Sequence, residues 1–502
     1  MLEFETMAKN MYAWDDEKGL FIPFSSTMRA VKSEISKLNS VSKEMVIERL
    51  KDDFNCDDIS FCYNWLKKWE KIHVPDYKSQ IPKEIDKSEI KSYLFAHCLS
   101  QLSLCTTEDC NFRCRYCSFS DFYEYNRGYS DKYMDFDTAK KAIDYFISLL
   151  NEGKKYNPIR KPALGFYGGE PLLNFGLIKK CIEYIESIYN DYEIIYTITT
   201  NGSMLDKKRA NWLMEHDFII FVSLDGPEDE HDRLRIYENG KGSFRDVIKN
   251  VTRIIRKGYK EIYCMPVFDW KSDLFKREEF FNRNDIPSVA RIALVNNIEG
   301  CRYYEQFTEK DYSAFLGQLE RARSCYYKDL NLQRGKEKLS FFDKLVGLDP
   351  GEDLFKSVSI YIQPLIMPFT GACIPGRKLF VDVYGNYHAC ERVNSSFPIG
   401  NVNDGLNFEK ISKLIVGYLR SMDKCPSCKV SRKCTYCYQN FMTDNGFSPS
   451  STVCENIESI KKASFARSFN IAEIYPEFVE ESNYKHKNIK KYYGDDRNVF
   501  QT

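Results

Sequence analysis

The chain has 502 residues, and its 72 Lys and Arg residues balance its 72 Asp and Glu residues, so the formal net charge is zero. A neutral chain with 43% hydrophobic residues can bury several cores, but it lacks the basic footprint of nucleic-acid or membrane binding. No apolar run approaches the ~20 residues that span a bilayer. Because the 18 cysteines occur without a signal-peptide pattern, we expect a reducing compartment, the cytoplasm.

Residues 1–85 are predicted to form a small domain in which a hairpin precedes helices. The hairpin covers 11–24, and two or three amphipathic helical segments follow it before a proline-containing, charged linker at 73–88. This layout resembles the winged-helix-like recognition domain of peptide-modifying enzymes, which captures a precursor's leader peptide as an added strand. DNA binding is the competing interpretation, but the segment contains no basic helix.

Three cysteines lie on one short loop directly after the strand-like stretch 100–107: Cys110, Cys114 and Cys117. The spacing Cys-x3-Cys-x2-Cys can hold three corners of a [4Fe–4S] cube and leaves the fourth iron without a protein ligand. A structural zinc site needs four ligands, and neither a His nor a fourth Cys follows nearby. A zinc site or a redox pair remains the alternative.

Residues 95–300 alternate short β-rich runs with amphipathic helices. One predicted helix covers 137–150, with Asp137 as its N-cap. Six such units predict an α/β fold with a parallel sheet covered by helices. Because there are six units rather than eight, we expect a partial (β/α)6 TIM-like barrel. Its motifs fall just beyond strand ends, where such folds place their chemistry.

Three later strands of this region also end in polar or glycine-rich motifs, namely FYGGEP at 166–171, TITTNG at 197–202 and VSLDGP at 222–227. Together with the cysteine loop, these motifs resemble the radical S-adenosylmethionine (SAM) enzymes. The resemblance implies that residues 95–310 form a radical SAM core. It also implies that SAM chelates the open iron of the cluster held by the three cysteines.

The same resemblance implies cofactor contacts from Tyr116, Gly168, Gly169, Glu170, Asn201, Ser223 and Arg235. The glycine pair would let the backbone approach the SAM amino group, because no Cβ intervenes. Arg235 would approach the SAM carboxylate, with a solvated surface arginine as the alternative. The nearby His231 and Asp232 are expected to structure their loop.

A second set of cysteines occupies the C-terminal third, comprising Cys373, Cys390, Cys425, Cys428, Cys434, Cys437 and Cys454. Two close pairs are typical of a zinc ribbon, but the whole arrangement resembles the SPASM extension of radical SAM enzymes, which holds two further [4Fe–4S] clusters. The quartet departs from the usual pattern, with two residues rather than three between its last two cysteines. We place this extension at 373–480 and a bridging region at 311–372.

The SPASM resemblance implies an outer auxiliary cluster held by Cys425, Cys428, Cys434 and Cys454, and an inner one held by Cys373, Cys390 and Cys437. With only three cysteines, the inner cluster would keep an open iron that suits a substrate thiolate. Glu391 stands where sulfatase-maturing relatives have an aspartate base, so it is a catalytic candidate. An ordinary surface carboxylate is the alternative for Glu391.

The activity implied by resemblance begins with a flavodoxin- or ferredoxin-type donor that reduces the first cluster. SAM is then cleaved to methionine and a 5′-deoxyadenosyl radical, which takes hydrogen from a ribosomally made precursor peptide with a leader. We predict a thioether crosslink from a cysteine sulfur to a carbon of another residue. Carbon–carbon crosslinking, sulfatase-maturase-like oxidation of Ser or Cys, and a non-catalytic iron–sulfur or zinc scaffold remain alternatives.

Overall fold

The computed structural model describes residues 1–37, 41–72, 81–298, 300–328, 338–347, 366–367, 369, 371–448, 454 and 456–476. Part of the predicted linker and much of the predicted bridging region 311–372 lie outside the described residues. In the described part of the chain, no helix combines the length and the apolar character needed to cross a membrane.

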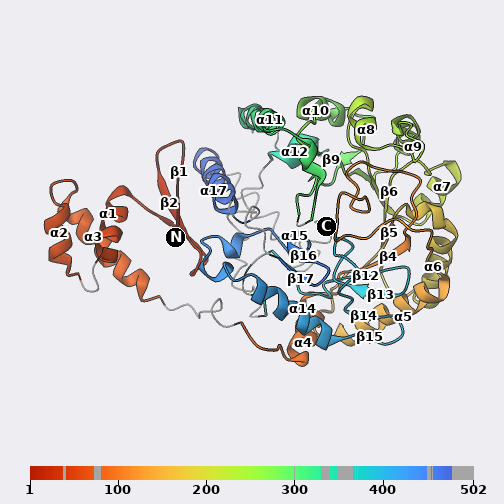
Figure 1. Cartoon of the computed structure of the whole chain (residues 1–502), viewed down its shortest axis with the longest axis horizontal. Coiled ribbons are helices and arrows are strands. Elements are labelled where there is room, and N and C mark those ends of the chain that lie inside the picture. The colour runs from red at the N-terminus through yellow and green to blue at the C-terminus, as the bar shows by residue number, and fades with distance from the viewer. Residues whose placement is uncertain are drawn as a thin grey trace.

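The N-terminal residues form a three-stranded antiparallel sheet followed by three helices (Figure 1). The elements are β1 (Leu2–Glu5), β2 (Met11–Asp15), β3 (Leu20–Pro23), α1 (Ser26–Lys37), α2 (Lys43–Leu50) and α3 (Cys56–Glu70). The pairing of β2 with β3 confirms the predicted hairpin, whereas the polar N-terminus gave no sign of β1. Ala13 and Ile22 of this sheet pack in one core with residues of the three helices.

The central sheet has ten strands in the order β10-β8-β7-β6-β5-β4-β12-β13-β14-β15. Its first six are mutually parallel: β4 (Gln101–Thr107), β5 (Ala163–Gly168), β6 (Ile195–Thr200), β7 (Ile219–Val222), β8 (Ile262–Cys264) and β10 (Ser288–Val289). They confirm the predicted parallel sheet. The hydrogen-bonded order ends at β10 and β15, so the partial barrel remains a prediction. Two short strands, β9 (Val267–Phe268) and β11 (Ala293–Leu294), pair separately.

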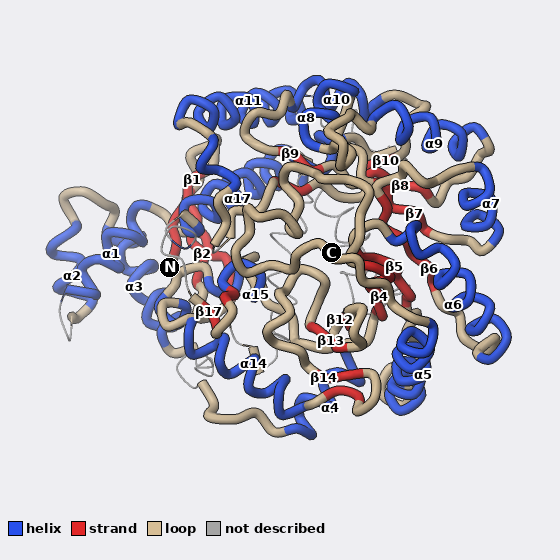
Figure 2. The backbone as a smooth tube through the Cα atoms, turned by 45° about the vertical axis from the view of Figure 1, so that its right-hand side comes forward, coloured by secondary structure: helices blue, strands red, loops and turns tan. Residues whose placement is uncertain are grey.

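Helices surround the outer side of these strands, as Figures 1 and 2 show for α5, α6, α7 and α9. Their bounds are α4 (Lys87–His97), α5 (Phe136–Gly153), α6 (Phe175–Ile188), α7 (Lys207–Glu215), α8 (Glu228–Leu234), α9 (Phe244–Arg256), α10 (Leu274–Asn282), α11 (Glu309–Lys328) and α12 (Phe341–Leu345). The predicted N-cap Asp137 is wrong. Asp135 caps α5, because its extended backbone lets its carboxylate accept the Thr138 N–H at 2.7 Å.

The C-terminal third continues the same sheet. Strand β12 (Lys378–Val381) runs parallel to β4, and β13 (Asn386–His388), β14 (Gly400–Asn401) and β15 (Gly405–Leu406) follow in antiparallel order. The remaining elements are α14 (Phe408–Ser421), α15 (Tyr438–Phe441), β16 (Met442–Thr443), β17 (Gly446–Phe447) and α17 (Ile457–Ile474). The central sheet therefore joins two regions that the sequence divided at 311–372.

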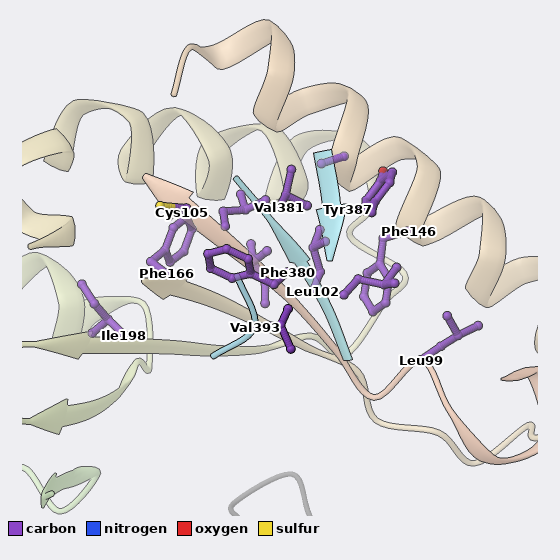
Figure 3. Packing of buried hydrophobic residues seen from close by; sticks show 14 of the residues in the cluster. Leu99, Leu102, Cys105, Phe146, Phe166, Ile198, Phe380, Val381, Tyr387 and Val393 are labelled. Atoms are coloured by element: carbon purple, nitrogen blue, oxygen red, sulfur yellow. The ribbon is translucent and has the colours of Figure 1, made fainter. Parts of the chain in front are cut away.

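One apolar core packs the C-terminal third against the parallel strands. Figure 3 shows Phe380 and Val381 of β12 among Leu102 of β4, Phe166 of β5 and Ile198 of β6, and all five are buried. Close packing of such side chains leaves the strand ends little freedom. Residues at the ends of β4, β5, β6 and β12 are thus held in a fixed relation to one another.

Candidate active site

One cavity of about 280 Å³ opens at the carboxyl ends of the parallel strands, and Cys110, Cys114 and Cys117 all line it. The loop directs N–H groups at two of the sulfurs: Phe112 N donates to Cys110 Sγ at 3.4 Å, and Phe119 N donates to Cys117 Sγ at 3.5 Å. Side chains from outside the loop lie beside two sulfurs, with Asn201 Nδ2 at 4.0 Å from Cys110 Sγ and Arg235 Nη1 at 3.9 Å from Cys114 Sγ.

The chemistry of these donors fits an iron–sulfur cluster. Burial raises the pKa of Cys114 to about 12 and also raises the pKa of Cys110 and Cys117. Buried thiols of this kind give thiolate ligands when a metal replaces their protons, and N–H donors then stabilise the sulfur charge. Among the residues described here, no three Cys, His, Asp or Glu side chains are grouped to bind a single metal ion. The fit to an iron–sulfur cluster therefore rests on the three thiols and on the N–H groups that lie near their sulfurs.

The glycine pair after β5 packs against the cysteine loop. Gly168 has φ of +137°, and a Cβ there would collide with the carbonyl oxygen of Thr107, as one at Gly169 would with that of Asp109. Gly169 N donates to Thr107 O at 2.8 Å, and Glu170 N donates to Asp109 O at 2.9 Å. Glycine is therefore needed at both positions because the neighbouring backbone leaves no room for a Cβ. The sequence had suggested a different reason, namely close approach of the cofactor.

Glu170 is fully buried and ties the ends of two strands together. Its Oε1 accepts from Thr200 Oγ1 at 2.7 Å and from Leu172 N at 3.1 Å, while Oε2 accepts from Asn201 N at 2.7 Å. Burial raises its pKa to about 7, against these hydrogen bonds, which favour the carboxylate. Glu170 therefore positions Asn201, whose amide reaches the Cys110 sulfur.

Arg235 is 7% exposed, so the surface-arginine alternative is wrong. Its Nε donates to Asp225 Oδ2 at 2.8 Å, and Tyr116 OH donates to the same oxygen at 3.0 Å. Val267 N donates to the other carboxylate oxygen at 2.8 Å. Ser223, just beyond β7, lines the cavity beside Tyr116 and Arg235. At this end of the cavity, Arg235 is therefore already paired with an acidic residue, Asp225.

His231 and Asp232 hold the chain around Arg235, which agrees with their predicted structuring role. His231 lies in α8, a helix that the sequence reading missed, and its Nδ1 accepts the Asp225 N–H at 3.2 Å. Burial lowers the pKa of His231 to about 3, so the ring is neutral. Asp232 Oδ1 accepts from Ser243 N and Phe244 N, both at 2.8 Å, at the start of α9.

Charged side chains from the C-terminal third line the same cavity, among them Lys378, Glu391 and Arg392. Lys378 Nζ lies 2.8 Å from Glu391 Oε2, and the glutamate side chain is 7% exposed, so the surface-carboxylate alternative is wrong. Burial opposes ionisation of Glu391, but Lys378 and Arg392 outweigh it and lower the pKa to about 2. Glu391 is thus an ionised carboxylate with a lysine partner.

Cys373, Cys390 and Cys437 come from three separate segments, and Cys390 directly precedes the cavity residue Glu391. Burial, Glu391, Cys373 and Cys437 all raise the pKa of Cys390, in that order. In the outer set, burial, Cys428 and Cys454 raise the pKa of Cys434. Cys425 begins a short 3-10 helix (Cys425–Ser427), which Cys428 caps. The assignment of these cysteines to two clusters remains a prediction.

Sequence reasoning missed Lys378 and Arg291 as cavity residues. Lys378 begins β12. Arg291 interrupts the apolar run 289–295, for which the sequence predicts only a strand. A charged residue inside such an apolar run was the available signal.

Comparison with known proteins agrees with this architecture. A model of the radical SAM superfamily matches residues 104–272. The chain is 30% identical over 309 residues to an uncharacterized protein of Methanocaldococcus jannaschii, which covers 61% of this chain and 90% of that protein.

Two further proteins match over longer stretches. The chain is 24% identical over 441 residues to the radical SAM cyclopropyl synthase TigE of Paramaledivibacter caminithermalis, covering 84% of this chain and 86% of TigE. The structure of anSMEcpe with bound AdoMet shares the fold, with a TM-score of 0.56 at 18% identity over 79% of this chain and 98% of that one.

Proposed function

Because the chain belongs to the radical SAM superfamily of enzymes, we propose that it takes hydrogen from a residue of a ribosomally made precursor peptide and joins that carbon to a cysteine sulfur. The observation that carries this proposal is the single cavity that reaches from Cys110, Cys114 and Cys117 to Glu391 and Gln439, which adjoin the second cysteine set. A peptide residue in that cavity would lie against the first set of cysteines and beside residues that adjoin the second set in the sequence.

Cys110, Cys114 and Cys117 would hold the SAM-binding [4Fe–4S] cluster. When bound, the reduced cluster and SAM supply one-electron cleavage of the S–C5′ bond and so a radical that abstracts hydrogen from an unactivated carbon. The chain itself orients and shields this chemistry. Asn201 and Arg235 lie beside the sulfurs of Cys110 and Cys114.

Residues around the loop would form the SAM site. Tyr116, Gly168, Gly169, Asn201, Ser223 and Arg235 all line the cavity. Since Asp225 accepts from Nε of Arg235, the guanidinium is held with Nη1 toward Cys114, and we propose that it binds the carboxylate of the cofactor. Glu170, enclosed by its own hydrogen bonds, would act by positioning Asn201.

The C-terminal cysteines would hold two auxiliary clusters, the outer one through Cys425, Cys428, Cys434 and Cys454 and the inner one through Cys373, Cys390 and Cys437. Three thiols leave one inner position free for a substrate thiolate, which supports a thioether product. Glu391 is the proposed acceptor of the substrate proton. Its ion pair with Lys378 makes the carboxylate a weak base, so release of that pair would have to accompany proton transfer.

The N-terminal sheet would bind the leader of the precursor, and a flavodoxin- or ferredoxin-type protein in the cytoplasm would supply the electron. Support for leader binding is the layout of β1 to β3 with α1 to α3, whose outer strands β1 and β3 each have one edge without a partner strand in the described residues.

Carbon–carbon bond formation is the second candidate, and similarity to the cyclopropyl synthase TigE across 84% of the chain favours it. Oxidation of Ser or Cys is also compatible with the 24% identity to a cysteine-type anaerobic sulfatase-maturating enzyme of Clostridium perfringens. Thioether formation, carbon–carbon bond formation and oxidation of Ser to an aldehyde each remove two hydrogens, so mass alone does not separate these three, whereas oxidation of Cys to an aldehyde also replaces sulfur by oxygen.

The test is co-expression with each cysteine-bearing peptide found in the short open reading frames beside this gene, followed by mass spectrometry and thiol alkylation. A thioether predicts a loss of two hydrogens together with one thiol that no longer alkylates, and no change with the Cys114→Ala enzyme. A peptide that loses two hydrogens but keeps every thiol indicates the carbon–carbon product if it does not react with a hydrazine, and an oxidised serine if it does. An unmodified peptide beside an enzyme that cleaves SAM contradicts the proposal.

A further inference from the structure

Two guanidinium groups lie at the C-terminal end of the cavity. Arg291 comes from the segment between β10 and β11, and Arg392 follows Cys390 and Glu391; both line the cavity. Nη1 of Arg291 is buried and has no hydrogen-bond partner in the described part of the chain. An unsatisfied buried donor on a charged group is costly, so such a group indicates a missing acceptor.

The other charged side chains of the cavity are already paired. The charged side chains that line the cavity are Arg235, Arg291, Lys378, Glu391 and Arg392. Arg235 is paired with Asp225, and Lys378 is paired with Glu391 at 2.8 Å. Within the described residues, neither Arg291 nor Arg392 forms an ion pair with a carboxylate, although both line the cavity.

Both guanidinium groups are cationic at neutral pH and line the same cavity, so their like charges repel each other there. An anion placed between two such groups would relieve the repulsion and satisfy the free donor.

We propose that Arg291 and Arg392 bind a carboxylate of the substrate peptide, either an Asp or Glu side chain or the peptide's C-terminal carboxylate. This inference rests on the proposed peptide substrate. Paired guanidiniums suit a carboxylate because their planar N–H groups match its two oxygens. Binding there would place an acidic part of the peptide beside Glu391 and the inner cysteines.

The competing role for Arg291 is that of a counter-charge to the inner cysteines, because Cys437 is among its neighbours. The two roles differ in what a substitution disturbs. A counter-charge acts whether or not a peptide is present, so its loss changes iron content and the reduction of the cluster. A substrate contact acts only on peptide binding and leaves both unchanged.

The experiment measures fluorescence anisotropy of three labelled hexapeptides, anaerobically, with reconstituted and SAM-loaded enzyme. The peptides are Ala-Cys-Ala-Ala-Asp-Ala-amide, its Asn counterpart, and the Asn peptide with a free C-terminus. We expect the wild-type enzyme to bind at least one acidic peptide about tenfold more tightly than the neutral one, which corresponds to ~1.4 kcal/mol. Which acidic peptide is preferred identifies the source of the carboxylate.

The variant Arg291→Gln should abolish this preference, and Arg291→Lys should restore part of it. The control is Arg245→Gln, which removes an exposed arginine paired with Glu228 and so tests the general effect of charge. Equal binding of the three peptides to the wild-type enzyme overturns the proposal, as does loss of iron from Arg291→Gln. If acidic peptides bind through Arg291 yet the precursor is never modified, the carboxylate site stands and the proposed function fails.

Discussion

The two cysteine triads that flank the cavity are built in opposite ways. Cys110, Cys114 and Cys117 share one loop that follows β4, and the ends of β5 and β6 hold that loop by backbone and side-chain hydrogen bonds. Cys373, Cys390 and Cys437 come from three segments that converge only when the C-terminal third has folded. The first site is a property of a local motif, and the second is a property of tertiary structure.

The two triads also differ in their surroundings. Beside the first triad, Arg235 is matched by Asp225. Beside the second, Lys378, Arg291 and Arg392 face a single carboxylate, that of Glu391. A balanced site suits a cofactor that stays in place, whereas an unbalanced one suits a substrate that arrives with the missing charge. Four experiments probe this contrast.

The largest effect should come from removing one thiol of each triad. We expect Cys114→Ala to abolish both SAM cleavage and peptide modification, because its thiolate belongs to the site where the radical arises. Cys390→Ala should abolish modification while 5′-deoxyadenosine formation falls less than tenfold. Chromatography of nucleosides and mass spectrometry of the peptide measure the two outcomes. Equal loss of SAM cleavage in both variants would show that the triads do not act separately.

A large loss of stability should follow Asp225→Asn. Asp225 is fully buried and accepts from Arg235, Tyr116 and Val267, so the substitution leaves the Arg235 charge without a partner. We expect the free energy of unfolding to fall by ~3–5 kcal/mol, measured by urea denaturation. Asp229→Asn, which breaks an exposed pair with Lys276, is the control and should cost less than ~1 kcal/mol. Similar losses in both would contradict the balanced site.

The outer cysteine loop depends on the N-terminal domain. Asp16 accepts from Trp14 Nε1 at 2.8 Å, from Ser431 Oγ at 2.7 Å and from Arg432 N at 3.2 Å, between Cys428 and Cys434. Phe4 and Trp14 also pack with Phe465 of α17.

We therefore expect Asp16→Ala to cost ~1–3 kcal/mol, because two buried donors and the part-buried Arg432 N–H lose their acceptor. Iron should pass to a chelator faster, while SAM cleavage is retained. Glu17→Gln, an exposed neighbour in the same turn, is the control. Unchanged iron release in Asp16→Ala would show that the outer loop holds itself.

The smallest effect is a dependence of stability on pH near the first triad. His231 has a pKa of about 3 in the folded chain against an ordinary 6.5, so between these values the unfolded chain binds a proton that the folded chain does not. Lowering the pH below 6.5 should therefore destabilise the protein, with a contribution of ~1.4 kcal/mol per pH unit. His231→Gln should flatten the slope of unfolding midpoints between pH 7 and 5.

Local patterns explain what could be predicted from the sequence. The cysteine loop, the hairpin at 11–24 and the six parallel strands each follow from spacing or periodicity within a short stretch. The cap of α5 was misplaced by two residues because Asp135 and Asp137 both lie at the start of the amphipathic pattern, but Asp137 is already inside α5 and Asp135 has the extended backbone of a cap. Strand β1 was missed because its residues alternate with acidic ones in a polar terminus.

The charges in the cavity could not be predicted in this way. Arg291 and Arg392 line one cavity because segments far apart in the sequence fold together, and Lys378 of β12 pairs with Glu391, which follows β13. The pairing of β12 with β4 likewise joins residues 378–381 to 101–104, which no local pattern specifies. These long-range contacts determine which charged groups find a partner and which remain free for a substrate.

The most direct measurement is the fate of SAM with purified, iron-reconstituted enzyme under anaerobic conditions and a chemical reductant. We predict equal amounts of 5′-deoxyadenosine and methionine from the wild-type enzyme and neither product from Cys114→Ala. Iron-loaded wild-type enzyme that leaves SAM intact, or that matches the Cys114→Ala variant, would contradict it.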